Sequence, residues 1–184
     1  IEVTIIDKRA TISIIGGGAS GVLTAANIIR HTTVPVNINL IEKRPHIAGG
    51  VAYSTTNAAH LLNVPAGRMG AFPDDIRHFF QWLTANGYDH DDHAFVPRMI
   101  FGRYLKSVLE SAAAERADIA RLNVIGGEAV DAANGLVRLA DGGELSADLT
   151  VLAFCIFLPS VPYVETDDYT ASPNYFRDQW SPFL

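Results

Sequence analysis

A glycine-rich turn between an apolar strand and an apolar helix constrains the fold of this chain more than any other feature. Residues 11–15 form a β-branched run, and residues 22–29 carry apolar side chains at helical spacing. The turn between them contains the pattern Gly16-x-Gly18-x-x-Gly21. A second apolar strand at residues 36–41 completes a βαβ unit, whose two strands are expected to be parallel.

Each glycine of this pattern has a physical role in binding a dinucleotide. Gly16 permits the tight turn out of the strand, Gly18 lets a pyrophosphate approach the backbone, and Gly21 allows the helix to pack closely on the strand. The helix N-terminus offers free N–H groups and the positive end of its dipole to the anion. The alternative is a glycine-rich turn that binds nothing.

Glu42 ends the second strand about 20 residues after Gly21, where an acid accepts hydrogen bonds from ribose hydroxyls. Its carboxylate would repel a 2′-phosphate, which favours FAD or NAD over NADP and leaves those two unresolved. Lys43 and Arg44 follow, and either could reach a phosphate. A solvated loop charge is the alternative for both, and more so for Lys43.

The remaining pattern predicts an α/β fold with a parallel sheet and an antiparallel β-meander insertion. Residues 43–73 lack periodicity but hold apolar side chains, so we expect a packed, functional loop. Helices are expected at residues 74–85 and 97–116, and a buried strand at 148–157. Between them, at about residues 121–147, Asn134-Gly135 and Asp141-Gly142 predict hairpins of the meander. We expect one Rossmann-like domain over residues 1–184, the amino-terminal portion of a longer protein.

Composition excludes several classes of function. Fourteen Lys and Arg against twenty Asp and Glu give a formal charge of −6, which argues against a nucleic-acid partner. The longest apolar run, residues 151–158, is too short to span a membrane. The single cysteine, Cys155, excludes an internal disulfide and a multi-cysteine metal site, and fits a cytoplasmic location. We predict no metal, because the histidines at residues 90 and 93 fit a polar loop.

The chain resembles the uncharacterised bacterial FAD/NAD(P)-binding protein family, one of the flavoproteins with two dinucleotide-binding domains. Matching stretches cover nearly the whole chain, and residues 60–69, His-Leu-Leu-Asn-Val-Pro-Ala-Gly-Arg-Met, are the most specific. The other matches are residues 14–21, 41–44, 50–55, 95–98, 102–105 and 127–130. The resemblance implies FAD as the bound cofactor, and we expect NAD(P)H as a co-substrate. Where such proteins have an Ala-Thr-Gly-like turn, this chain has Ala153-Phe154-Cys155.

The resemblance also implies a set of cofactor-binding residues. The glycine pattern would hold the FAD pyrophosphate, Glu42 the adenosine ribose, and the backbone of Val130 the adenine. Gly50 would lie in a flavin-contacting loop, while His60, Asn63 and Arg68 could line the flavin or the substrate. The full predicted set is Gly16, Gly18, Ala19, Ser20, Gly21, Glu42, Lys43, Arg44, Gly50, Asn63, Arg68, Val130 and Ala153.

These features predict the FAD-binding portion of a flavin-dependent oxidoreductase or monooxygenase-like enzyme, reduced by NAD(P)H, with hydride transfer through the flavin. The cofactor supplies such chemistry, so no catalytic side chain needs to be evident. Two alternatives stay open: a non-catalytic nucleotide-binding module and an NAD-dependent dehydrogenase. The predicted meander argues against the dehydrogenase, because the plain doubly wound fold has none. The substrate and the oligomeric state are not indicated by the sequence.

Overall fold

The computed structural model describes residues 9–154 and 172–175. Four parallel strands form its central sheet, in the order β3-β2-β1-β7. Their bounds are Ala10–Ile15 for β1, Val36–Glu42 for β2, Ala120–Gly126 for β3 and Leu149–Leu152 for β7. Because β1 and β2 are neighbours, the turn after β1 and the residue that ends β2 meet at one edge of the sheet.

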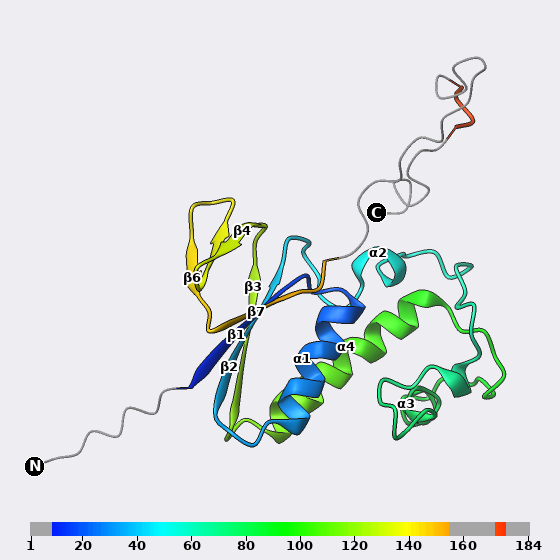
Figure 1. The fold of residues 1–184 in the computed structure, drawn as a ribbon. Coiled ribbons are helices and arrows are strands. Elements are labelled where there is room, and N and C mark those ends of the chain that lie inside the picture. The colour runs from blue at the N-terminus through cyan, green and yellow to red at the C-terminus, as the bar shows by residue number, and fades with distance from the viewer. Residues whose placement is uncertain (1–8, 155–171, 176–184) are drawn as a thin grey trace, which may run out of the picture.

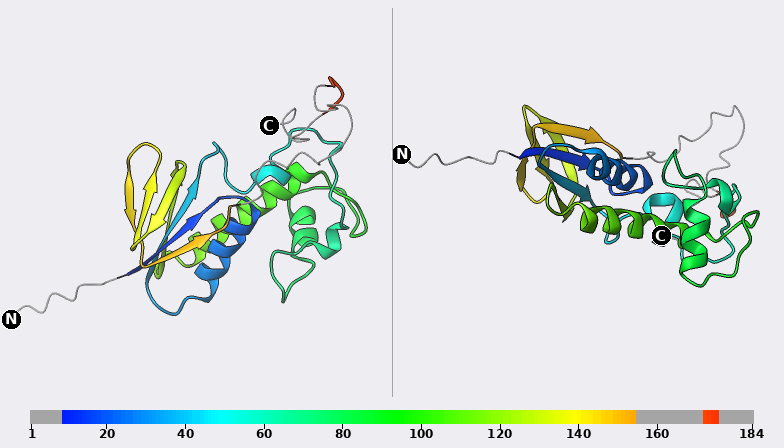
Figure 2. Two further views of the ribbon diagram at one scale, coloured as in Figure 1. Left: turned by 45° about the horizontal axis from the view of Figure 1, so that its top comes forward. Right: turned by 90° about the horizontal axis from the view of Figure 1, so that it is seen from below.

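Helices cover one face of this sheet and a small antiparallel sheet covers the other (Figure 1). Helices α1 (Ala19–His31) and α4 (Arg98–Glu115) lie side by side on the first face. The antiparallel sheet has the order β4-β5-β6, with bounds Ala129–Ala133, Leu136–Leu139 and Glu144–Ser146. The two further views in Figure 2 show the same three layers.

Alternate side chains of the central strands belong to two separate cores. On β1, Ile14 packs with the helices and Ile15 packs under the antiparallel sheet. On β2, Leu40 and Ile41 divide in the same way. Successive side chains of a strand point to opposite faces, so both layers fix which residues face inward.

The predicted βαβ unit is confirmed, and its helix is longer than the apolar spacing indicates. α1 begins after its N-cap, Gly18, and ends at His31. The Arg116 guanidinium donates to the carbonyl oxygens of Arg30, at 2.7 Å, and Thr32, at 2.9 Å. A cation is favourable there, because the C-terminal end of a helix carries partial negative charge.

The long loop after β2 is packed, as predicted, and contains helix α2 (Gly50–Tyr53) and the 3₁₀ turn η1 (Ala66–Arg68). The next helix, α3, spans His78–Ala85, so its predicted start at residue 74 was wrong. The preceding backbone forms a turn, in which the Asp75 N–H donates to the Phe72 carbonyl at 3.1 Å. The Ile76 carbonyl accepts a bond from the Gly70 N–H at 2.9 Å. α4 begins after Pro97, as predicted.

The predicted meander begins too early in the chain. Its first predicted piece belongs to β3, which pairs in parallel with β2 from Val36 opposite Ala120 to Glu42 opposite Gly126. The antiparallel sheet starts only at Ala129. The sequence shows where short apolar runs lie but not which neighbour they pair with, and here the 18-residue helix α4 supplies the crossover for a parallel strand. The hairpin at Asn134-Gly135 is confirmed, because both residues have positive φ.

The strand predicted at residues 148–157 is present as β7, but it is not buried. Leu149 is 55% exposed and Leu152 is 61% exposed, because among the described strands β7 pairs with β1 alone and lies at the edge of the sheet. The predicted continuation of this strand from Cys155 onward lies outside the described residues. No helix in the described ranges has the length and apolar character that crossing a membrane requires.

Candidate nucleotide-binding site

Three glycines of the turn after β1 are required by the packing of the protein itself. A Cβ on Gly16, whose φ is +107°, would lie 2.7 Å from the Ala153 carbonyl oxygen. A Cβ on Gly17 would lie 2.8 Å from the Cβ of Glu42, and one on Gly21 would collide with the Gly16 carbonyl oxygen. These glycines therefore allow the turn, helix α1 and the end of β7 to approach one another, whether or not a ligand binds.

Gly18 differs from these three, because the fold does not require a glycine there. Its φ of −71° suits any residue, and a Cβ would meet nothing nearer than the Gly50 Cα, at 3.6 Å. Gly50, with a φ of +51°, faces Gly18 from the loop after β2. Gly18 is part-exposed and no side chain of the described residues lies within 4 Å of its Cβ position, so side chains leave its backbone uncovered at the N-terminus of α1.

The N-terminus of α1 has the properties of an anion site. The first intrahelical bond runs from the Val22 N–H to the Gly18 carbonyl, at 3.0 Å. The amides of the first turn, Ala19 to Gly21, precede the hydrogen-bonded ladder and point out of the helix. The first turn of α1 contains no acidic residue and Gly18 has no side-chain cap, so no side chain of this turn competes with a bound anion.

Glu42 is held against this turn by two backbone amides. One carboxylate oxygen accepts the Gly17 N–H at 2.8 Å, and the other accepts the Arg44 N–H at 2.9 Å. The Gly17 carbonyl in turn accepts the Ala48 N–H at 2.7 Å, so the loop after β2 folds back over the turn. Each carboxylate oxygen retains a further lone pair, and the half-buried Glu42 can accept ribose hydroxyls while its position stays fixed.

The two basic residues after Glu42 have different surroundings. The Lys43 ammonium lies 3.0 Å from a Glu128 carboxylate oxygen, and both side chains are more than half exposed. Arg44 is half-buried, and its guanidinium has no hydrogen bond or ion pair with the part of the chain that the structure describes. Lys43 thus has a partner within the protein, whereas the Arg44 charge is available at the end of β2. Contact of either residue with a cofactor stays a prediction.

Val130 and Ala153 lie on or next to different sheets. Val130 is 62% exposed on β4, where the pairing with β5 is shifted between Ala129 and Asp131. Such a bulge leaves one residue out of the regular ladder. Ordinary strand packing, the alternative for Val130, therefore does not describe it. Ala153 follows β7, and its N–H donates to the Ile15 carbonyl at 2.8 Å, beside the glycine turn.

A family model described as FAD-NAD(P)-binding matches residues 13–157. The chain belongs to this family. Membership confirms the predicted fold class and supports FAD as the cofactor. The observed site fits FAD: the uncovered backbone at Gly18 and the fixed carboxylate of Glu42 match a pyrophosphate and its ribose.

Three solved structures resemble the chain in fold at low sequence identity. A lysine monooxygenase from Nocardia farcinica is 18% identical, with a TM-score of 0.54 over 77% of this chain and 42% of that one. A flavin-containing monooxygenase from Stenotrophomonas maltophilia is 19% identical, with a TM-score of 0.51 over 78% and 38%. An S-allyl-L-cysteine S-oxygenase from Allium sativum is 20% identical, with a TM-score of 0.52 over 79% and 36%. The chain therefore spans less than half of each protein's length, and no curated protein matches it.

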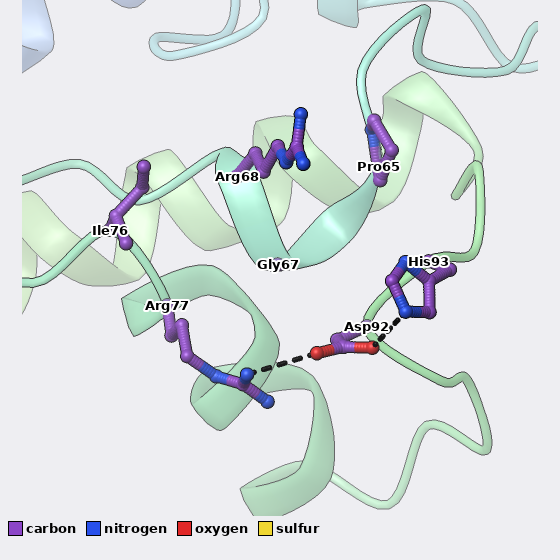
Figure 3. A pocket seen from close by; sticks show the side chains of 7 residues that line it. All are labelled: Pro65, Gly67, Arg68, Ile76, Arg77, Asp92 and His93. Atoms are coloured by element: carbon purple, nitrogen blue, oxygen red, sulfur yellow. Dashed lines mark ion pairs between the residues drawn. The ribbon is translucent and has the colours of Figure 1, made fainter.

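Residues predicted from the long loop are not all brought to the glycine turn. Asn63 is exposed on the loop, and His60 hydrogen-bonds through Nδ1 to the buried Thr55 hydroxyl at 2.8 Å. Arg68 lines a hollow of about 340 Å³ on the helical side of the molecule, and no residue of the glycine turn contributes to it (Figure 3). Within the described ranges, no group of three or more metal-ligating side chains comes together.

Sequence reasoning missed two residues that shape the site. Gly17 fixes the Glu42 carboxylate through its N–H, and Ala48 adopts a φ of +71° while bonding the Gly17 carbonyl. The glycine at position 17, between Gly16 and Gly18, was an available signal, because the pattern Gly-x-Gly leaves that position unspecified. Ala48 carried no signal, since alanine seldom has positive φ.

Proposed function

We propose that residues 1–184 form the FAD-binding portion of a flavin-dependent oxidoreductase that NAD(P)H reduces. Gly18 carries this proposal: it is the one position of the turn where glycine serves neither the packing nor the conformation of the backbone. A ligand that must approach the helix N-terminus closely accounts for it. Family membership and the antiparallel sheet between β3 and β7 support a flavoprotein over a plain NAD-dependent dehydrogenase.

Each part of the site has a separate task in holding FAD. The amides of Ala19 and Ser20 would bind the pyrophosphate, with Gly50 as the opposite wall. Glu42 would accept the hydroxyls of the adenosine ribose, and the exposed backbone at Val130 would meet the adenine. The half-buried Arg44 would add a positive charge beside the adenosine. When bound, the flavin supplies hydride acceptance from NAD(P)H and delivery to a substrate or oxygen.

Gly18→Ala tests the assignment of the pyrophosphate site. The added methyl makes an ordinary contact with Gly50, so the protein should keep its melting temperature. It also occupies the approach to the α1 amides, so we expect FAD affinity to fall by about tenfold or more. Gly126→Ala is the matched control, because a Cβ there meets nothing within 4 Å. Equal FAD affinity in both variants and the unchanged protein would contradict the proposal.

Reduction of the bound flavin tests the enzymatic part. The FAD-loaded protein is mixed with NADH or NADPH in the absence of oxygen, and the flavin absorbance is followed. Bleaching by either nucleotide is expected of an oxidoreductase. A protein that retains FAD but is bleached by neither would be a non-catalytic nucleotide-binding module. A cytoplasmic location, for which the single cysteine argues, stays a prediction.

A further inference from the structure

The hollow at η1 is formed by three segments that are far apart in sequence. Pro65 and Gly67 form its first wall, Ile76 and Arg77 precede α3 on the second, and Asp92 lies on the third (Figure 3). Its volume of about 340 Å³ is within the range of small-molecule sites, roughly 300–1,000 Å³. No residue of the glycine turn lines it, and the proposed binding of FAD does not use it.

Backbone hydrogen bonds hold the three segments together. The Gly67 N–H donates to the Asp92 carbonyl at 2.8 Å, and the Ala66 N–H donates to the Ala94 carbonyl at 3.0 Å. Glycine at position 67 eases this close approach, because a Cβ would lie 3.0 Å from both the Cβ and the carbonyl oxygen of Asp92. The hollow is therefore formed before any ligand binds.

The hollow has a surplus of positive charge. Arg77 lies 2.9 Å from an Asp92 carboxylate oxygen, and His93 lies 3.5 Å from the other oxygen. The Arg68 side chain extends away from this ion pair (Figure 3), and its guanidinium has no hydrogen bond or ion pair within the described part of the chain. Two guanidinium groups against one carboxylate leave a net positive site on a chain whose formal charge is −6.

The available donors favour a single carboxylate over a phosphate. The backbone amides of Gly67 and Arg68 already donate to the Asp92 and Pro65 carbonyls, at 2.8 and 2.9 Å. The His93 amide donates to a side-chain oxygen of Asp91 at 2.9 Å. A phosphate dianion normally needs several free amides or cations, whereas one planar guanidinium matches one carboxylate.

We propose that this hollow binds a small organic carboxylate, with Arg68 on the carboxylate and Ile76 against the apolar body. Ile76 is 58% exposed, so a ligand that covers it removes apolar surface from water. In the proposed oxidoreductase this ligand would be the substrate or product. That last assignment rests on the proposed function, whereas binding of the carboxylate does not.

Benzoate is the probe, because it combines one carboxylate with a flat apolar body. Its affinity for the full chain is measured by calorimetry or NMR, beside benzamide as the neutral analogue and phenyl phosphate as the dianion. We expect benzoate to bind more tightly than either. Arg68→Gln should weaken benzoate binding by about fivefold or more, since a charge-assisted pair is lost. Arg103→Gln, which changes an exposed arginine on α4 bonded to Tyr88, should leave it unchanged.

A second variant tests the same proposal if Arg68→Gln does not fold. Ile76→Asp places a negative charge at an exposed position of the hollow and should also weaken benzoate binding. Equal affinity for benzoate and benzamide, or benzoate binding that neither variant changes, would overturn the proposal. FAD affinity is measured on the same samples. Loss of FAD binding with benzoate binding intact would not contradict the proposed carboxylate site. Loss of benzoate binding with FAD binding intact would not contradict the proposed nucleotide site.

Discussion

The turn after β1 and the segment between α2 and α4 are stabilised in different ways. In the turn, backbone atoms lie so close to Gly16 and Gly21 that a Cβ on either residue would prevent the strand and helix from packing. In the segment, extended pieces are joined by separate hydrogen bonds, such as Leu62 N–H to the Val96 carbonyl at 2.9 Å. The difference teaches that the turn tolerates almost no change, whereas the segment should lose stability in small steps.

Gly21→Ala should have the largest effect. The new Cβ would collide with the Gly16 carbonyl oxygen, and both atoms belong to rigid backbone. We expect a loss of about 3 kcal/mol or more in the free energy of unfolding. Urea denaturation followed by circular dichroism measures it, with Gly126→Ala as the control. A loss below about 1 kcal/mol would show that the turn can relax, and the contrast between the regions would fail.

Tyr104 lies on α4 and bonds the segment through its hydroxyl, and Tyr104→Phe should have an intermediate effect. The fully buried Tyr104 hydroxyl accepts the Ala71 N–H at 2.8 Å and lies 2.7 Å from Nδ1 of His78. Its removal leaves the half-buried Ala71 amide without this acceptor, at a cost of about 1–3 kcal/mol in the free energy of unfolding. Tyr88→Phe, which removes an exposed bond from Arg103, is the control and should cost less than about 0.5 kcal/mol. Equal losses would contradict the assigned role.

The same hydroxyl predicts a loss of stability at alkaline pH. Burial raises the pKa of Tyr104 from 10.0 to about 12, against a smaller opposing effect of the Ala71 N–H. The unfolded chain therefore releases this proton first, so the contribution of Tyr104 is complete below pH 10 and falls as the pH rises toward 12. Melting temperatures across this range should decline less in Tyr104→Phe than in the unchanged protein. Parallel declines would assign the alkaline loss to other groups.

The sequence predicted the parts whose determinants lie close together along the chain. Glycine spacing placed the turn, apolar spacing placed α1, and Asn134-Gly135 placed a hairpin. Pairing partners were not predictable, so β3 was placed in the meander although its seven residues pair with β2. The hollow at Arg68 was not predictable either, since Gly67 and Asp92 are far apart in sequence and are joined by a backbone hydrogen bond. Local sequence patterns predict turns, helices and strands, whereas strand order and surface hollows depend on contacts between residues that are distant in sequence.

The smallest expected effect concerns a surface ion pair between the central sheet and the antiparallel sheet. Lys43 follows β2 and Glu128 precedes β4, with 3.0 Å between their charged atoms and both side chains largely exposed. Water and salt screen such a pair, so a double-mutant cycle with Lys43→Gln and Glu128→Gln should give a coupling below about 1 kcal/mol that declines with added salt. A larger, salt-independent coupling would mean that this surface contact fixes the antiparallel sheet on the central one. The stability of that layer would then come from a charge pair rather than from the apolar contacts of Ile41 with Val137 and Leu139.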